Sequence, residues 1–526
     1  MYLDFLSGAK NVADLYPDTS PESVAQCVSS RQYDREALAK ILQTQNERFG
    51  AKSRAMRNIE LLKQPDSLVV FAGQQAGLFG GPLLGFYKAL WAVKQAAELT
   101  EKLKRPVIPI FWIAADDHDF AEINHAYTFD VIGEPVQRTY YRVDNEGLPA
   151  YDLRFTDKAL FAELKDSLTD SLGRTDFTDD LYQRLFAAYK PGADFVTAFG
   201  QFFIDTMPDN GLVLFSPGDS EFKALAAPFF RLTLDKHREL KTALHKANEK
   251  ILSAGYHLQV EKEESACHMF LLDPERKAIH RDGDSYRVGD KTYSASELQR
   301  LIDTEPSRFS PDVLTRPAFA AYLFPTVEQG GGPSEVAYFA QLWRMFKVYG
   351  TPVPCFSGRV SVTLIEKRFE KLLAKYGLTF ADFCGDIEQV INEALGKSFP
   401  TDLEESFAKF RVNLREEFAG LSGRVVQFDK SLEANARQIL GKMEHALTTF
   451  ENKAFASHKR KMADERAALY RAGNSLFPRH GLQERTLSVV YYLSRYGYKL
   501  MDFICDSVEL DTMHHQLLYI SEMDKQ

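Results

Sequence analysis

Two apolar runs early in the chain each lead into a polar cluster. Residues 68–72 form one uninterrupted apolar run that stops at Gly73, and residues 107–114 form a second that leads into Asp116. Apolar runs of this length, bounded by turn residues, are typical of strands buried on both faces of a parallel sheet. Between the two runs, apolar residues recur at helical spacing from Leu83 onwards. The sequence therefore predicts a strand–helix–strand unit.

The alternation of strands and helices continues further along the chain. Apolar periodicity predicts helices within 20–63, 156–206 and 220–253, and further buried strands at 211–215 and 350–356. Alternating segments with turn signals predict a short β excursion at about 128–154 and a β-rich stretch at 255–300, within connecting insertions at about 128–155 and 220–310. We therefore predict an α/β fold with a Rossmann-type parallel sheet core and connecting insertions over 1–375.

The pattern changes in residues 401–470. Apolar residues recur at helical spacing over 403–428, and a second stripe then steps alternately by four and three: Leu432, Ala436, Ile439, Met443, Ala446 and Phe450. This narrow heptad seam favours an antiparallel α-helical coiled-coil arm, predicted over 385–475, above a helical layer packed on the core. The aromatic-rich tail, 476–526, is predicted to pack back on the core.

Composition excludes several classes of protein. The net charge of −9 and a pI near 5.8 argue against a nucleic-acid binder, which would carry a basic face. No apolar run approaches the roughly 20 residues that cross a bilayer, and the N-terminus lacks a signal-peptide pattern, so we expect a cytoplasmic protein without membrane contact. The five cysteines are scattered and form no CxxC motif, so neither a zinc site nor a disulfide framework is indicated.

The glycine-rich segment after the first predicted strand is a candidate binding element. Its candidate residues are Gly73, Gln74, Gln75 and Gly77. Glycine lets backbone N–H groups approach an anion, and the dipole of the following helix adds to the attraction. The spacing matches neither GxGxxG nor a P-loop, and a tight structural turn is the alternative.

A second candidate cluster follows the second predicted strand. It comprises Asp116, Asp117, His118, Asp119, Asn124 and His125. Carboxyl ends of parallel strands meet at one edge of a sheet, so both clusters should converge on one ligand crevice. His118 is the candidate general base, with Asp117 or Asp119 orienting it, while capping of a helix start is the alternative. The spacing of the carboxylates matches no metal-ligand pattern, so no metal is predicted.

Four segments, taken in order, resemble one family. They are 73–82, 111–125, 331–342 and 482–485, and together they resemble the bacillithiol biosynthesis cysteine-adding enzymes, a cysteine ligase family. One departure is that Asp116 stands where we expect a glutamate. The resemblance implies a Rossmann-type core akin to class I aminoacyl-tRNA synthetases, and a homodimer formed through the coiled coil. It also implies the last step of bacillithiol biosynthesis, in which the carboxyl group of cysteine forms an amide with the amine of glucosaminyl-malate.

The implied reaction requires an activated carboxyl group and a pocket that binds the two carboxylates of malate. A free carboxylate must be activated, so ATP or ADP is the candidate cofactor, by analogy with the synthetases. Those enzymes hold phosphates with a His-x-Gly-His turn, where this chain has residues 73–77 with glutamine amides. The two malate carboxylates suit Arg316 and Arg359, for which structural ion pairing is the alternative. Glu335, at a predicted helix start, is a further binding candidate or one half of a capping box.

Two other functions fit the same patterns. A nucleotide-binding sensor or scaffold protein could use a Rossmann-type domain and signal through its coiled coil. A sugar-nucleotide transferase would also place acidic residues beside a glycine turn. Catalytic turnover distinguishes an enzyme from a sensor, which would only bind nucleotide.

Overall fold

The computed structural model describes residues 1–141, 147–396 and 400–525. Its contacts divide the chain into two units: residues 1–364 with 482–526, and residues 365–481. The division therefore falls after Leu364 and after Gly481, while the predicted boundaries at 375, 385 and 476 stay predictions. Residues 142–146, 397–399 and 526, which belong to the predicted insertion, arm and tail, lie outside the described residues.

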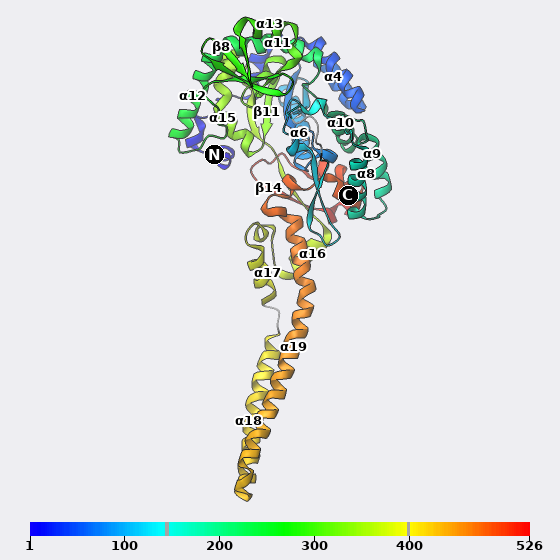
Figure 1. Cartoon of the computed structure of the whole chain (residues 1–526), viewed down its shortest axis with the longest axis vertical. Helices are drawn as coiled ribbons and strands as arrows, with labels where there is room; N and C mark the ends of the chain where they lie inside the picture. Colours follow the sequence, from blue (N-terminus) through cyan, green and yellow to red (C-terminus); the bar gives the residue numbers. More distant parts are fainter. Residues whose placement is uncertain (142–146, 397–399, 526) are drawn as a thin grey trace. The chain divides into compact units, whose positions relative to one another are not determined.

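A five-stranded parallel sheet forms the centre of the first unit (Figure 1). In spatial order its strands are β12 (Cys355–Gly358), β11 (Thr326–Gly331), β1 (Leu68–Gln74), β2 (Val107–Ile113) and β5 (Val213–Phe215). All neighbouring pairs are parallel. The chain runs outward from β1 to β5 and then crosses to β11 on the other side. The predicted α/β class is confirmed, and the strand order reverses between β1 and β11, where such sheets bind ligands.

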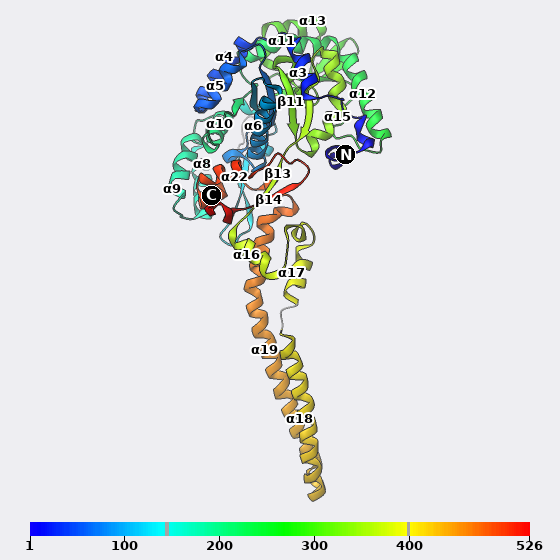
Figure 2. The ribbon, with the colours of Figure 1, turned by 180° about the vertical axis from the view of Figure 1, so that it is seen from behind.

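Helices cover both faces of this sheet because its strands are apolar on both sides. Alternate residues of β1 enter two cores, with Val70 in one and Phe71 in the other. The first core contains α3 (Pro21–Ser29), α6 (Leu84–Leu103) and α10 (Phe195–Thr206). The second contains α4 (Arg35–Phe49), α5 (Ser53–Leu62), α11 (Ser220–Asp235), α14 (Arg316–Leu323) and α15 (Pro333–Tyr349). Figure 2 shows α3, α6 and α15 around β11.

Amide side chains close the β5 edge of the sheet. Asn46 of α4 accepts from the backbone N–H of Leu214 at 3.0 Å and donates to its carbonyl at 2.8 Å. Gln45 makes the same double contact with Ser216, at 2.8 and 3.0 Å. An open strand edge presents unpaired donors and acceptors, so α4 takes the place of a sixth strand.

A second, antiparallel sheet lies within the predicted insertion at 220–310. Its strands, in spatial order, are β10 (Phe309–Pro311), β6 (Ala266–Leu272), β7 (Arg276–Asp282), β8 (Ser285–Val288) and β9 (Lys291–Ser294). One face packs on α11 and α13 (Ala295–Thr304), shown in green in Figure 1. We call it the accessory sheet. Its strands β6 and β7 bring Phe270 and Arg276 to the main sheet.

The remaining elements of the first unit are shorter or lie outside the two sheets. They are α1 (Tyr2–Leu6), α2 (Lys10–Ala13), α7 (Phe120–Ile123), β3 (His125–Phe129), β4 (Pro135–Thr139), α8 (Lys158–Leu172), α9 (Thr178–Ala188), α12 (His237–Ser253), β13 (Ser361–Ile365), α20 (Gln483–Thr486), α21 (Val489–Tyr496), α22 (Lys499–Ser507) and β14 (His515–Tyr519). Among the described residues, no helix has both the length and the apolar character that crossing a membrane requires.

The segment at 482–485 anchors the C-terminal tail to β13. Gln483 accepts from the backbone N–H of Leu364 at 2.8 Å and donates to its carbonyl at 3.0 Å. Glu484 accepts from the N–H of Val362 at 3.0 Å and from Arg359 Nη2 at 2.6 Å. Both members of the Arg359–Glu484 ion pair are buried. Arg359 therefore has the structural ion pairing that was considered as the alternative to malate binding, and its partner is Glu484.

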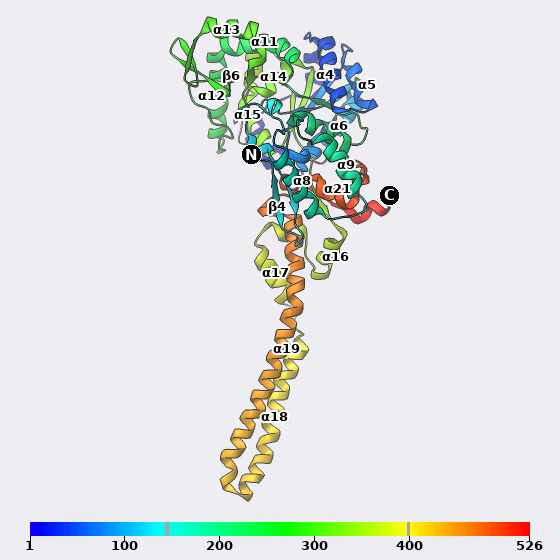
Figure 3. The same cartoon turned by 45° about the vertical axis from the view of Figure 1, so that its right-hand side comes forward.

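The second unit contains a long antiparallel helix pair, α18 (Thr401–Phe428) and α19 (Glu433–Leu476), drawn in yellow and orange in Figure 3. Alongside it lie α16 (Lys367–Tyr376) and α17 (Ile387–Gly396). The helices α18 and α19 are joined by ion pairs from Arg411 to Glu451 and from Arg415 to Glu444. The face of α19 that meets α18 therefore carries these two glutamates.

Part of the predicted heptad seam lies on the outside of this helix pair, whereas Phe450 packs against Phe407 of α18. Ile439 is 41% exposed and Met443 43% exposed, whereas Leu440 and Leu447, in line with the two paired glutamates, are partly covered. The stripe of α19 that faces α18 is therefore offset by one position from most of the predicted seam. A heptad spacing identifies an apolar stripe but does not specify which helix covers it.

The Arg359–Glu484 pair generates a stability prediction. Glu484→Gln should lower the free energy of unfolding by about 3–5 kcal/mol, because it leaves the buried Arg359 charge without its counterion. Equilibrium urea unfolding measures the loss. Asp506→Asn, the same chemical change at an exposed position, should stay within about 0.5 kcal/mol of the wild type. Equal unfolding midpoints for both variants would contradict the structural role given to Glu484.

Candidate functional site

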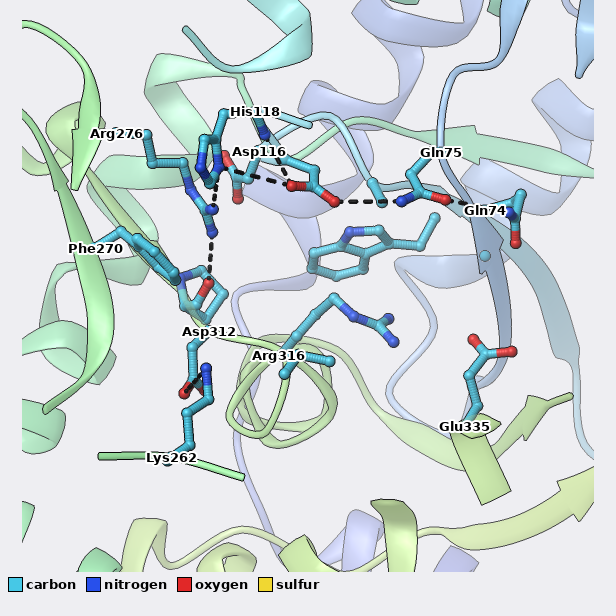
Figure 4. Close-up of a pocket in the computed structure, with 16 residues that line it drawn as sticks. Gln74, Gln75, Asp116, His118, Lys262, Phe270, Arg276, Asp312, Arg316 and Glu335 are labelled. Atoms are coloured by element: carbon cyan, nitrogen blue, oxygen red, sulfur yellow. Dashed lines mark hydrogen bonds and ion pairs between the residues drawn. The ribbon is translucent and has the colours of Figure 1, made fainter. Parts of the chain in front are cut away.

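A cavity of about 340 Å³ lies at the carboxyl ends of β1 and β2 (Figure 4). Eight of the residues predicted from the sequence line it: Gly73, Gln74, Gln75, Asp116, Asp117, His118, Arg316 and Glu335. The two polar clusters that follow the first two strands thus converge on one crevice. This is the crevice that a doubly wound sheet forms where its strand order reverses.

Close packing of β1 on β2 shapes the base of the cavity. Gly73 pairs with Trp112, whose side chain also lines the cavity. A Cβ atom at Gly73 would lie 2.6 Å from the Trp112 carbonyl oxygen. Only glycine permits this approach, so Gly73 is needed for the sheet as well as for the cavity surface.

Asp116 is held by a buried lysine that the sequence did not point to. Lys223 of α11, only 1% exposed, donates to Asp116 Oδ1 and to the Phe309 carbonyl, both at 2.8 Å. Burial lowers the pKa of Lys223, and the Asp116 carboxylate opposes that shift. The pair links the end of β2 to α11 and to the accessory sheet.

His118 lies between Asp117 and Arg276. The backbone N–H of His118 donates to Asp117 Oδ1 at 2.8 Å, and Arg276 Nη1 lies 3.1 Å from His118 Nδ1. Burial lowers the pKa of His118, and the Arg276 charge lowers it further. Arg276 packs over the Phe270 ring at 3.7 Å and donates to Ser310 Oγ at 2.9 Å. The accessory sheet therefore supplies one wall of the cavity.

The candidates Asp119 and Gln75 lie on either side of Glu122. Asp119 caps α7 by accepting from the backbone N–H of Glu122 at 3.3 Å, and its side chain does not line the cavity. Gln75 donates to Glu122 and, at 3.3 Å, to Asp117 Oδ2. Burial raises the pKa of Glu122, and the charges of Asp119 and Asp117 add to the rise. The helix-capping role considered for His118 is thus filled by Asp119.

A second buried lysine holds the other side of the cavity. Lys88 of α6, 4% exposed, lies 2.5 Å from Glu335 Oε2 and donates to Gly73 O and Gln74 Oε1, both at 3.0 Å. Glu335 also accepts from the backbone N–H of Gly332 at 2.8 Å, which is the capping interaction considered for it. Burial opposes ionisation of Glu335, yet Lys88 and Arg316 keep its pKa below the usual value.

Two cations face the cavity from α14 and from the segment before β6. Arg316 donates through Nη2 to the Tyr338 hydroxyl at 2.7 Å. Lys262 lies 3.4 Å from Asp312 Oδ2. Asp312 is buried, and although burial opposes ionisation, His268 and Lys262 hold its pKa far below the usual range. Figure 4 shows Arg316 pointing into the cavity opposite Gln75.

Four other predicted binding residues do not line the cavity. Asn124 accepts from the backbone N–H of Tyr140 through its own carbonyl, and its side chain contacts His125 at the start of β3. Arg359 pairs with Glu484. Gly77 lies in the buried part of the glycine turn.

The glycine turn has few backbone donors to offer an anion. The N–H of Gly77 donates to Gln75 O at 2.9 Å, that of Gly81 to Leu78 O at 3.0 Å, and that of Gly80 to the Tyr189 hydroxyl at 2.9 Å. These three N–H groups are already used within the protein and are therefore not available to a phosphate group.

The sequence carried signals for some of the missed residues but not for others. Lys88 and Lys223 each stand on the apolar face of a helix, next to Tyr87 and Phe222, where an unpaired lysine would be costly. That placement could have suggested a buried partner. Arg276 and Lys262 have no comparable signal, because only the fold of the accessory sheet brings them to β2. Within the described residues, no group of three or more histidine, cysteine, aspartate or glutamate side chains is arranged to hold a metal ion.

Comparison with known proteins gives matches along the whole chain. Residues 1–360 match the family model of the bacillithiol biosynthesis BshC N-terminal Rossmann-like domain, and residues 362–520 match that of the BshC C-terminal coiled-coil domain. A protein of Salinibacter ruber named "Putative cysteine ligase BshC" is 33% identical over 98% of this chain and 96% of its own length. Proteins of the same name from Koribacter versatilis and Geobacillus thermodenitrificans are 34% and 32% identical, over 96% and 94% of this chain and 95% and 92% of their own lengths.

The packing of the glycine turn generates a prediction that separates a structural role from a binding role. Gly77→Val should destabilise the fold by at least about 1–3 kcal/mol, because a Cβ atom there would lie 2.7 Å from the Gly81 Cα atom. The φ of Gly77 is −66°, so crowding and not backbone strain is the cause. Thermal unfolding measures the effect.

Gly85→Ala is the matched control in the adjoining helix. A Cβ atom at Gly85 would be in ordinary contact with the Phe203 ring at 3.6 Å, and alanine has the higher helix propensity. We expect its melting temperature to equal or exceed that of the wild type. A Gly77→Val protein that melts like the wild type but is inactive would assign Gly77 to ligand binding instead.

Proposed function

The chain belongs to the bacillithiol biosynthesis BshC family, and from this premise we propose that it is a cysteine ligase that joins cysteine to glucosaminyl-malate. The proposed reaction forms an amide between the carboxyl group of cysteine and the amine of the glucosaminyl group. The observation that carries the proposal is a single cavity, at the switch point of a Rossmann-type sheet, whose walls present carboxylates and cations together. A substrate pair with both ammonium and carboxylate groups requires such a mixed surface.

The charges of the cavity wall support an assignment of substrate groups. Arg316 and Lys262 are suited to the malate carboxylates, since a guanidinium can bind a carboxylate through two parallel hydrogen bonds. Asp117 and Glu335 face the same space and are suited to ammonium groups. Gln74 and Gln75, held by Lys88 and Asp117, offer neutral amide groups between them.

Amide formation removes the elements of water. Because a carboxylate oxygen is a poor leaving group, the carboxyl group must first be activated, so that this oxygen departs as part of a better leaving group. A nucleoside triphosphate such as ATP would supply that group by activating the carboxyl of cysteine. In the glycine turn, the N–H groups of Gly77, Gly80 and Gly81 are bonded internally and are not available to the phosphates. We therefore assign no nucleotide position and derive no step through it. The chain's own residues bind and orient the two substrates, with side chains of opposite charge placed against the carboxylate and ammonium groups.

The reaction and the role of Arg316 can be tested together. Purified protein with cysteine, glucosaminyl-malate and ATP should give the cysteinyl amide by mass spectrometry. Arg316→Met should reduce kcat/KM for glucosaminyl-malate by about 10–100-fold, the range expected for one lost hydrogen bond to a charged group. The effect should appear mainly in KM, and it should be absent with methyl glucosaminide, which lacks malate.

The control for Arg316→Met is Arg287→Met, at an exposed position of β8, which should behave like the wild type. If no amide forms with any nucleotide, while a nucleotide binds tightly, the sensor function is favoured instead. An equal loss with both sugar substrates would remove Arg316 from malate binding while leaving the reaction itself intact.

We further propose that the outer seam of α19 joins two copies of the chain. The apolar side chains Ile439 and Met443 of α19, and Leu421 of α18, are among the exposed apolar side chains of this helix pair. Burying such a stripe against its symmetry mate would remove this apolar surface from water and form a closed dimer. The match to a coiled-coil domain supports this proposal.

Ile439→Asp tests the dimer. A carboxylate buried in the seam without a partner costs several kcal/mol, so the dissociation constant should rise by at least about 100-fold in analytical ultracentrifugation. Gln438→Asp introduces the same side chain at the neighbouring exposed position and should dimerise like the wild type. An Ile439→Asp protein with an unchanged dissociation constant would show that this seam is not the interface.

A further inference from the structure

We infer that Arg276 is a positioning residue that fixes the tautomer of His118, so that His118 acts on the substrate as a hydrogen-bond donor through Nε2 and not as a general base. The inference rests on the proposed ligase function and specifies how one group of that site acts. It follows from which atoms of three side chains meet at the cavity wall.

The first step is the identity of the atom that faces His118. Arg276 Nη1 lies 3.1 Å from His118 Nδ1. A guanidinium has only N–H donors and stays charged, so it cannot accept a hydrogen bond. Nδ1 must therefore offer its lone pair, and the single proton of a neutral imidazole must then be on Nε2.

The second step is that the guanidinium cannot easily turn away. Arg276 Nε donates to Ser310 Oγ at 2.9 Å, Nη2 donates to the Pro311 carbonyl at 3.2 Å, and the group packs on the Phe270 ring. Three separate contacts within the accessory sheet hold its plane. Turning the imidazole over would instead place a carbon-bound hydrogen against this cation, which is less favourable than a lone pair.

The third step excludes the competing partner of Nδ1. Asp117 Oδ1 is 3.7 Å from Nδ1, beyond hydrogen-bond range, and it already accepts the backbone N–H of His118 at 2.8 Å. The charged groups near the ring are Arg276 from β7 and the aspartates 117 and 119 from its own loop. Burial and Arg276 together lower the pKa of His118, which agrees with a neutral ring.

The functional consequence concerns the oxygen of the reacting carboxyl group. When the amine adds to the activated carboxyl carbon, a carbon–nitrogen bond forms and the π electron pair of the carbonyl moves onto its oxygen. The pair then returns as the bond from carbon to the leaving group breaks, and the proton of the new ammonium passes to the departing group or to water. A donor aimed at the oxygen stabilises this charge, and the loss of one such donor typically costs about 100–1,000-fold in kcat. A base needs a free lone pair, and in this tautomer the lone pair lies on Nδ1, which faces Arg276, while Nε2 carries the proton.

Two substitutions of His118 distinguish a donor from a base. The amide nitrogen of Gln occupies nearly the place of Nε2 and donates but cannot accept a proton, while Leu does neither. We expect His118→Gln to keep kcat within about tenfold of the wild type and His118→Leu to lose about 100–1,000-fold. Equal losses in the two variants, at unchanged melting temperature, would overturn the inference.

The pH dependence gives a second readout. Protonation of Nδ1 replaces its lone pair by an N–H that faces the Arg276 cation, so it breaks the contact that orients the ring, and wild-type kcat should fall as pH drops through the lowered pKa of His118. In Arg276→Met no cation opposes the protonated ring, which still donates through Nε2, so the acid limb should flatten, while Arg287→Met should leave it in place. In His118→Gln that limb should be absent. A limb that persists in Arg276→Met and moves to higher pH, as the titration of a general base would, contradicts the inference.

The tautomer itself can be measured without activity. In protein labelled with ¹⁵N-histidine, the signals of His118 are those missing from His118→Gln. We expect the Nδ1 resonance at the position of an unprotonated imidazole nitrogen and Nε2 at that of a protonated one. A protonated Nδ1 would overturn the inference even if the ligase reaction is observed. Conversely, this result stands if the ligase reaction fails, so the two proposals can fail separately.

Discussion

The organisation of the cavity depends on pairing every buried charge at the strand ends. A charged side chain in a crevice of this kind is tolerated only when an opposite charge and hydrogen bonds replace its water. Lys223 meets this condition for Asp116, and Lys88 meets it for Glu335. Lys223 comes from α11 and Lys88 from α6, and these two helices cover opposite faces of the sheet. The ion pairs therefore also fix the positions of α11 and α6 relative to the strand ends. The carboxylates are thereby held in place before any substrate arrives.

The same constraint gives the accessory sheet a chemical role. A Rossmann-type sheet supplies side chains from its strand ends and following loops, which here are mainly carboxylates and amides. The cation beside His118 is instead Arg276 of β7, whose other hydrogen bonds go to strand β10 of the accessory sheet. The insertion thus supplies the cation that faces His118, while Lys88 and Arg316 of the core lie near Glu335. This division explains why residues about 160 positions apart in the chain act on one imidazole.

Sequence reasoning located the crevice better than it assigned roles within it. Apolar runs followed by polar residues predicted both β1 and β2 and the convergence of Gln75 and His118, because parallel strands of one sheet end at one edge. It assigned Arg359 and Gly77 to the same crevice, and the structure places neither in its lining. An arginine in an apolar stretch of sequence indicates a buried ion pair, but it does not identify the partner. Here the partner is Glu484, which is distant in sequence.

The sequence by itself determined the α/β class, the parallel core strands other than β11, the long helix pair and the crevice at the strand ends, because these follow from local periodicity and from the direction of the chain. Tertiary structure alone decided which charges pair, which face of α19 meets α18, and which nitrogen of His118 carries its proton. Those features depend on contacts between segments far apart in the chain. Local patterns record that a polar group is buried, whereas only the folded packing determines which atom satisfies it.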